Sequence, residues 1–193
     1  SIFSNVDELQ KFYYLNLFRG YSRLLLFGSL FNSALDVKNK TAKIRILAEQ
    51  MPPGIDLPVL RFYREYFRVF DSESKIKTDT AFMTLRAVLF ENEEHIDRED
   101  FVFMLRMLFQ FGAKAYEDGN KECGIQVFEL LRLTNHRKLW HNFNGKLSEY
   151  AFSNSVLFAL KMGEFDWVHK FIFDNADFID SDNSKEIVNY NLA

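Results

Sequence analysis

The feature that most constrains this fold is a glycine that separates two apolar-patterned segments near the end of the chain. Apolar residues recur every three or four positions on both sides of Gly163, which is the spacing of a helix face. They are Phe152, Val156, Ala159 and Leu160 before the glycine, and Phe165, Val168, Phe171, Ile172 and Phe178 after it. Two helices joined by so short a turn run antiparallel and share a buried face. The sequence therefore predicts a helical hairpin centred on Gly163.

The same pattern occurs once more upstream. Aligning Gly119 with Gly163 matches Cys123, Gly124, Val127 and Phe128 with Trp167, Val168, Phe171 and Ile172. A third unit is expected where another helix opens at Asn183. Repetition with a period of roughly 35 to 45 residues is typical of helical arrays. We therefore predict an all-α fold of stacked antiparallel helical hairpins that forms a short right-handed α-solenoid.

The final unit, residues 152–193, resembles a tetratricopeptide repeat, and residues 97–134 resemble one more weakly. The matching positions are Phe152, Val156 and Ala159 in the first helix, Gly163 and Phe165 at the junction, and Val168 and Ile172 in the second helix. The chain departs from the family at Val168, where a small residue is usual. It also lacks a closing proline, and its spacing exceeds the usual length of about 34 residues. The resemblance implies a noncatalytic scaffold that mediates protein or peptide interactions.

The resemblance also implies where a partner would bind. In this family the exposed side of each first helix lines a concave groove. In the final unit that side carries Tyr150, Ser153, Asn154, Leu157 and Lys161. Some family members clamp a terminal carboxylate with paired asparagines and lysines, of which only Asn154 and Lys161 have counterparts here. The implied partner is a protein or peptide, and its identity stays open.

The composition is typical of a folded helical protein. Hydrophobic residues make up 48% of the 193 residues and charged residues 26%, while three prolines and eight glycines are few for a β-sandwich or a disordered chain. No stretch alternates convincingly between apolar and polar residues, so we predict no sheet. We expect residues 1–193 to form a single all-helical domain, with an internal hinge at the polar stretch 71–78.

The charge pattern favours neither nucleic acid nor membrane as a partner. A net charge of −3 gives no bulk attraction to polyanions. A basic strip at Arg61, Arg64 and Arg68 is interrupted by Glu65, and we interpret it as a solvated helix face. The longest apolar stretch, residues 21–35, is shorter than the roughly 20 residues that a membrane span needs. We therefore expect a buried helix there and no membrane span.

The single cysteine and the two chain ends give expectations about context. Cys123 is interpreted as a buried thiol in a reducing compartment, so we expect a cytoplasmic protein. The first residue is Ser1, which leaves a removed leader open. Asn183 and Glu186 predict a capped helix that reaches Ala193 with its apolar residues unpartnered. We therefore expect a segment of a longer chain, and packing against the remainder of that chain is a third interpretation of its apolar surface.

Further helices are predicted upstream. The first is capped at Ser4 and weakened at Gly20, and another occupies residues 41–51. Pro58 opens a helix whose apolar face consists of Val59, Phe62, Tyr63, Tyr66, Phe67 and Phe70. The segment 97–117 is apolar nearly all round, which predicts a central helix. The acidic residues that precede and open it are interpreted as carboxylates favoured at a helix start.

No constellation of residues indicates catalysis or metal binding. His95, His136, His141 and His169 lack the spacing of zinc or di-iron ligands, and only His136 and His141 form a loop pair of interest for binding. No phosphate-binding loop, dinucleotide fingerprint or nucleophile elbow occurs. We therefore predict no metal, no cofactor and no enzymatic activity. The rival interpretations are a pocket for a small molecule, lined by some of the 22 phenylalanines, and an enzyme that uses dispersed residues.

Overall fold

The computed structural model describes residues 2–30, 43–44, 46–52, 55, 57–70, 78–142, 144–180 and 188. Within these residues the chain is mostly helical, so the predicted all-α class is confirmed. The chain divides into two compact units, residues 1–111 and 112–193, and each is described by itself. The predicted hinge at 71–78 lies outside the described residues, apart from Thr78, which begins a helix.

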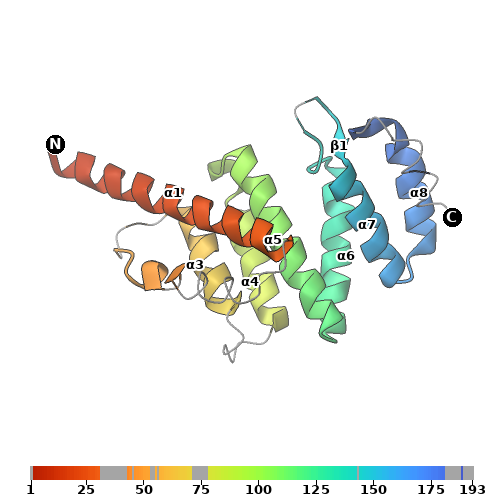
Figure 1. The fold of residues 1–193 in the computed structure, drawn as a ribbon, viewed down its shortest axis with the longest axis horizontal. Helices are drawn as coiled ribbons and strands as arrows, with labels where there is room; N and C mark the ends of the chain where they lie inside the picture. The colour runs from red at the N-terminus through yellow and green to blue at the C-terminus, as the bar shows by residue number, and fades with distance from the viewer. Residues whose placement is uncertain are drawn as a thin grey trace. The chain divides into compact units, whose positions relative to one another are not determined.

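The first unit is a set of packed helices (Figure 1). It contains α1 (Ile2–Leu30), α3 (Pro58–Phe70), α4 (Thr78–Glu91), the short 3-10 helix η1 (Glu93–His95) and most of α5 (Arg98–Glu117). α3 packs against both α1 and α4. Pro58 opens α3 as predicted, because its fixed φ and missing N–H suit the first turn of a helix.

An aromatic cluster joins α1 to α3. Phe18 of α1 is buried and stacks on Tyr63 and Phe67 of α3, with ring centroids 6.1 Å apart in both pairs. Phe62 is fully buried on the same helix. Burying a ring of this size stabilises the folded state by roughly 1.5–3 kcal/mol. The aromatic side predicted for α3 is therefore the side that faces the core of the unit.

Two predictions about α1 were wrong. The helix begins at Ile2, before the predicted cap at Ser4, and it continues through Gly20 without interruption. A glycine inside a helix costs about 1 kcal/mol relative to alanine. However, Phe18 and Ser22 are buried on either side of Gly20 and hold both turns against the unit. Tertiary packing therefore outweighs the local tendency of the glycine to weaken the helix.

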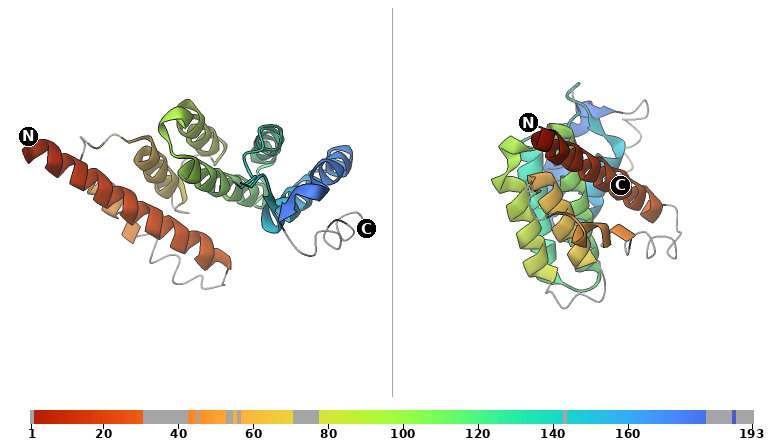
Figure 2. Two further views of the ribbon diagram at one scale, coloured as in Figure 1. Left: turned by 90° about the horizontal axis from the view of Figure 1, so that it is seen from above. Right: turned by 90° about the vertical axis from the view of Figure 1, so that its left-hand side faces the viewer.

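The second unit contains the hairpin that the sequence predicted. It comprises the end of α5, α6 (Lys121–His136), α7 (Glu149–Lys161), α8 (Phe165–Asn175) and the 3-10 helix η2 (Ala176–Phe178). α7 packs against α8 and also contacts α6 (Figures 1 and 2). The buried members of the predicted hairpin face are Phe152, Val156, Ala159, Val168, Phe171 and Ile172. Leu160, Phe165 and Phe178 were predicted for the same face but are exposed, because each lies at or beside a helix end.

The prediction that the chain has no sheet was wrong. Two short strands, β1 (Leu147–Ser148) and β2 (Ile179–Asp180), pair in parallel, with Leu147 opposite Ile179. Both of these apolar side chains are buried. Strands of two residues are too short to display an alternating pattern, so the sequence carries no signal for them. The strands precede α7 and follow α8, and they tie the two ends of this hairpin together.

Two glycines in the second unit end a helix in the same way. After α5 and after α7, the N–H of Gly119 or Gly163 donates to the carbonyl three residues earlier, and the next N–H donates to the carbonyl five residues before it. The N···O distances are 2.9 Å after α5 and 3.0 Å after α7. This pair of bonds is the Schellman motif, in which a residue with positive φ ends the helix. The φ angle is 100° at Gly119 and 79° at Gly163, so the two glycines aligned in the sequence are also equivalent in conformation.

Candidate functional site

The five residues predicted to line a binding surface lie on one helix. Tyr150, Ser153, Asn154, Leu157 and Lys161 all belong to α7, whose first turn is capped by Ser148. Tyr150 and Leu157 are about half exposed, Lys161 is exposed, and Ser153 and Asn154 are partly buried. Their spacing of three or four residues places them in one row along the helix. We call this row the α7 surface.

The carboxyl end of the α7 surface is joined to the end of α5. Lys161 Nζ lies 2.6 Å from Glu117 Oε1, and the Lys161 carbonyl accepts a hydrogen bond from Tyr116 Oη at 3.1 Å. The Tyr116 ring also meets Phe158 edge-on, with centroids 5.8 Å apart. The Lys161 ammonium is thus held by a carboxylate of its own chain. Binding a terminal carboxylate of a partner would require it to exchange Glu117 for the partner.

A close approach between α5 and α6 positions Tyr116. A Cβ atom added at Gly124 would lie only 2.9 Å from Tyr116 Cε2 and closer still to Cδ2, well inside van der Waals contact. Gly124 therefore leaves the space that the Tyr116 ring fills. Next to it, Cys123 is fully buried, as predicted, and its N–H donates to Asn120 Oδ1 at 3.1 Å. Because Gly124 has no side chain, the Tyr116 ring can lie close to α6 in the position from which it contacts α7.

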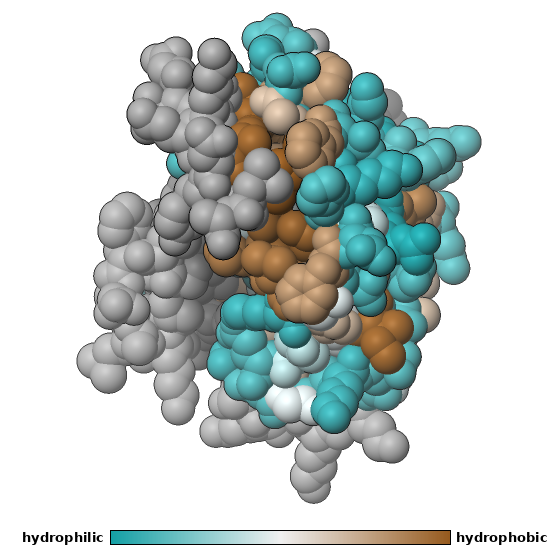
Figure 3. Space-filling model, turned by 90° about the vertical axis from the view of Figure 1, so that its right-hand side faces the viewer, coloured by the Kyte–Doolittle hydropathy of each residue, from teal (hydrophilic) through white to brown (hydrophobic). Residues whose placement is uncertain are grey.

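The outer side of α8 carries exposed aromatic residues, one of which, Phe165, was predicted for the buried face. Phe165 is 66% exposed and Phe173 62% exposed, and His169 lies between them with its ring centroid 4.7 Å from that of Phe173. Figure 3 shows apolar side chains gathered on the face of the second unit that carries α8. The aligned positions of α6 are Lys121, Ile125 and Glu129, which are also exposed. The second helix of the upstream hairpin therefore packs without aromatic residues at these positions.

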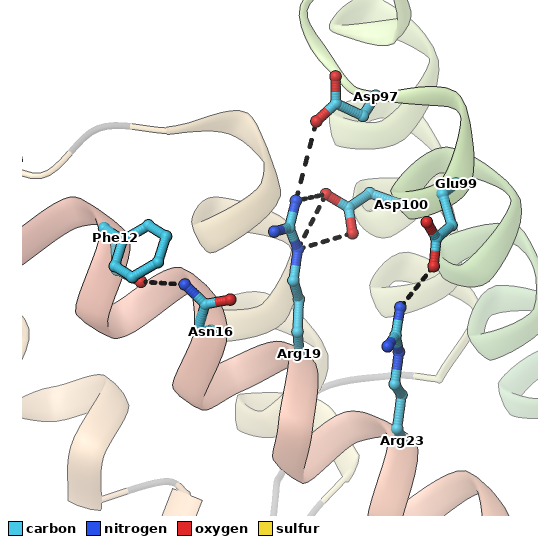
Figure 4. A network of polar contacts seen from close by, with 7 residues as sticks. All are labelled: Phe12, Asn16, Arg19, Arg23, Asp97, Glu99 and Asp100. Carbon is cyan, nitrogen blue, oxygen red and sulfur yellow. Dashed lines mark hydrogen bonds and ion pairs between the residues drawn. The ribbon is translucent and has the colours of Figure 1, made fainter.

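A charged cluster joins α1 to the start of α5 in the first unit (Figure 4). Arg19 Nε donates to both carboxylate oxygens of Asp100 at 2.9 and 3.1 Å, and its Nη2 also contacts Asp100. Arg23 Nη2 lies 2.7 Å from Glu99 Oε1, and Asp97 lies 3.9 Å from Arg19. The hydrogen bond to Asp100 raises the pKa of Arg19 further above its ordinary value. Because the two arginines face three carboxylates, the cluster holds two helices together.

This cluster was not predicted from the sequence. The acidic residues before and within the first turn of α5 were interpreted as partners of the helix dipole, and Glu99 and Asp100 do lie in that turn. Asp100, however, is only 5% exposed, and its partner lies 81 residues away in the sequence. A spacing of this kind leaves no local pattern. Two arginines one turn apart in a largely apolar stretch, Arg19 and Arg23, are the signal that could have raised the question.

The remaining candidates do not converge on a chemical site. His136 is exposed while His141 is buried, and the His141 ring meets Phe178 with centroids 5.9 Å apart. The two histidines therefore do not present one exposed pair, as the loop hypothesis required. Among the described residues, no three histidine, cysteine, aspartate or glutamate side chains come together in a way that could hold a metal ion. Nor does any described helix combine the length and apolar character that crossing a membrane would require.

Comparisons with protein-family models, with curated proteins and with solved structures found no match to this chain. The tetratricopeptide resemblance therefore stays a prediction. The matching backbone geometry of the turns at Gly119 and Gly163 is the observation that bears on it most directly.

Proposed function

We propose that this protein is a noncatalytic helical-repeat scaffold whose second unit binds a peptide or another protein along the α7 surface. The observation that carries the proposal is the direct contact between equivalent positions of successive hairpins. Glu117 and Lys161 each lie two residues before a turn glycine, and they form an ion pair. In stacked repeats, each unit contacts its neighbour through corresponding positions. The contact is therefore of the kind that an α-solenoid would produce.

The burial of aligned residues supports the same arrangement. In three of the four aligned pairs, both residues are buried: Gly124 with Val168, Val127 with Phe171, and Phe128 with Ile172. In the fourth pair, Cys123 is buried and Trp167 is partly buried. Gly124 supplies the small residue that the tetratricopeptide family usually has and that Val168 does not. The upstream hairpin thus agrees with the family at the position where the final hairpin departs from it.

The chemistry of the α7 surface indicates what it would bind. Tyr150 and Leu157 offer exposed apolar area two turns apart. Tyrosine in particular is enriched among the few interface residues that contribute most of the binding energy. Ser153 and Asn154 lie between them and can pair with the backbone of a bound segment. Lys161 is held by Glu117, so a terminal carboxylate is not the main feature recognised. We infer a peptide segment with two apolar side chains spaced to reach Tyr150 and Leu157.

A peptide selection tests this proposal. A random peptide library displayed on phage is selected on the intact protein, and the enriched peptides are measured by titration calorimetry. We expect the Tyr150→Ala, Leu157→Ala double variant to weaken binding by at least about tenfold, because truncating a central anchor costs more than roughly 1 kcal/mol. Unchanged circular dichroism would show that the variant is folded.

Ile125→Ala provides the matched control. Ile125 is about half exposed on α6, so the substitution removes similar apolar area away from the α7 surface. It should leave peptide affinity unchanged. Enriched peptides that bind the double variant as tightly as the native protein would contradict the proposal, as would a selection that enriches no peptide. The rival interpretations, a pocket lined by phenylalanines and an enzyme with dispersed residues, gain no support from the contacts of the described residues.

A further inference from the structure

The amino-terminal half of α1 carries an apolar row that faces away from its own unit. Val6, Leu9, Phe12 and Tyr13 are between 46% and 67% exposed, whereas Phe18 and Ser22 on the opposite side of the helix are buried. At 100° per residue, Val6, Leu9 and Tyr13 lie within a narrow strip, and Phe12 lies beside it. This part of α1 extends past the other helices of its unit (Figures 1 and 2). We call these four residues the α1 stripe.

The α1 stripe has the spacing of a coiled-coil seam. Val6, Tyr13 and Gly20 recur every seven residues, and Leu9 and Asn16 occupy the intervening positions three residues after the first two. These correspond to the a and d positions at which two helices meet, and Phe12 is then at a flanking position. Asn16 already donates from its side-chain amide to the Phe12 carbonyl at 2.8 Å, and its side-chain oxygen is left to accept a bond from a partner.

The charges of this part of α1 lie beside or opposite the line of Val6, Leu9 and Tyr13. By the same angular spacing, Asp7 and Lys11 point toward the side of Phe18, whereas Glu8, Arg19 and Arg23 lie on the flank that carries Phe12. Lys11 Nζ pairs with Glu8 Oε1 at 2.8 Å, and Arg19 pairs with Asp100. Val6, Leu9 and Tyr13 carry no charge, and Arg19 and Arg23, which flank the α1 stripe, are each paired with a carboxylate of their own chain. A second copy would therefore meet the stripe without the cost of burying an unpaired charge.

The backbone at Gly20 is open to a neighbour. A Cβ atom built at Gly20 has no atom within 4 Å, so a second helix can approach this part of the seam closely. Residues 46–52 do not fill the space beside Gly20. The hydrogen bond from Tyr14 Oη to the Gln50 carbonyl, at 3.4 Å, places that segment on the Tyr14 side of α1. A bulky residue of a partner would fit opposite the glycine.

We propose that the α1 stripe is the seam of a homodimer, in which α1 of a second copy of this chain pairs with it as a two-stranded coiled coil. The exposed fractions correspond to on the order of 400 Å² of apolar side-chain area per copy, since an aromatic ring alone presents roughly 150–250 Å². Interfaces are about 56–58% apolar, so the full contact would cover about 700 Å² per copy. That is close to the roughly 800 Å² per partner of a stable standard-size interface.

The test is the molar mass of the intact protein in solution. Analytical ultracentrifugation over a range of concentrations should show a reversible dimer for the native chain. The Leu9→Glu, Tyr13→Glu double variant should be monomeric throughout the range, because each dimer would then bring four carboxylates into its seam. Both positions are exposed in the monomer, so circular dichroism and urea unfolding should show a helical, folded protein of nearly native stability.

Met83→Glu is the matched control, because it makes the same chemical change at an exposed apolar residue of α4. This variant should dimerise like the native protein. A native chain that stays monomeric at the highest attainable concentration would overturn the proposal. So would a dimer that persists in the Leu9→Glu, Tyr13→Glu variant, because the contact would then lie elsewhere. Peptide binding at the α7 surface can fail or succeed independently of either result.

Discussion

The two units of the chain hold their helices together by different means. In the first unit, Arg19 and Asp100 form a largely buried ion pair between positions 81 residues apart, beside an aromatic cluster built around Phe18. In the second unit, a repeated glycine turn joins neighbouring helices, and Gly124 lets two of them approach closely. One unit depends on a contact that only the fold brings together. The other depends on short-range geometry that recurs at the ends of α5, α6 and α7.

The difference teaches where each unit is vulnerable. Removing one charge from a buried pair leaves its partner without compensation, whereas a glycine turn fails only when a side chain is added to it. The stability of the first unit should therefore be most sensitive to substitutions that remove side-chain atoms. The stability of the second should be most sensitive to substitutions that add them. Substitutions in the two units test this contrast.

The largest effect is expected from Asp100→Ala. The substitution removes the main partner of Arg19, and the free energy of unfolding should fall by about 3 kcal/mol, the lower end of the range for breaking a buried pair because Arg19 is partly exposed. Urea unfolding followed by circular dichroism measures it. Glu99→Ala is the control, since the Glu99 carboxylate is mostly exposed and its pair with Arg23 should contribute less than about 1 kcal/mol. Equal losses in the two variants would contradict the special role of Asp100.

The next effect separates two glycines that both lie inside helices. Gly124→Ala should destabilise the protein by about 2 kcal/mol, because the new methyl group would clash with the Tyr116 ring, which is itself held by Lys161. Gly20→Ala should instead stabilise it by about 0.5–1 kcal/mol, because alanine is the better helix former and nothing lies near its methyl group. Thermal and urea unfolding give both values. Shifts of the same sign would show that Gly124 is not a packing position.

Substitutions at the two turn glycines should have equal and smaller effects. Gly119→Ala and Gly163→Ala should each cost about 1–2 kcal/mol, the penalty for a residue with a side chain at positive φ. The penalty should not abolish folding, because α6 ends in the same motif with Lys138 at φ 52°. Asparagine at either glycine should cost less than alanine, since it tolerates this conformation better. Unfolding free energies that differ widely between the two turns would break their equivalence.

The smallest effect is expected from Glu117→Gln. Its ion pair with Lys161 is about half exposed, so its loss should lower the free energy of unfolding by only about 0.2–1 kcal/mol. The loss should shrink further at high salt, which screens exposed charges. A double-mutant cycle with Lys161→Met isolates the pair. A coupling energy of zero would show that this ion pair does not stabilise the fold. The equivalence of the two glycine turns would not be affected by that result.

Local sequence was informative wherever the structure depends on neighbours. The hairpin around Gly163, its upstream counterpart at Gly119 and the start of α3 at Pro58 all follow from spacing and from the backbone preferences of glycine and proline. The residues of the α7 surface share one helix for the same reason. That they bind a partner is a prediction, which the peptide selection tests.

Other features depend on distant contacts and left no trace in the sequence. The partner of Asp100 comes from another helix, and the strands at Leu147 and Ile179 are too short for an alternating pattern. Phe165 was assigned to the buried face because it lies at helical spacing from Val168 and Ile172, yet it is exposed at the start of α8. Helical spacing identifies an apolar face but does not tell whether a neighbouring helix covers it.

The small parallel sheet has a consequence for how such a chain can grow. Because β1 precedes the hairpin, β2 follows it and the two run in the same direction, the backbone leaves this module beside its point of entry and on the same heading. A tandem duplication of residues 147–180 would therefore require no reversal of the chain and no long linker. Gain or loss of residues 147–180 as one module would thus leave the course of the chain on either side unchanged.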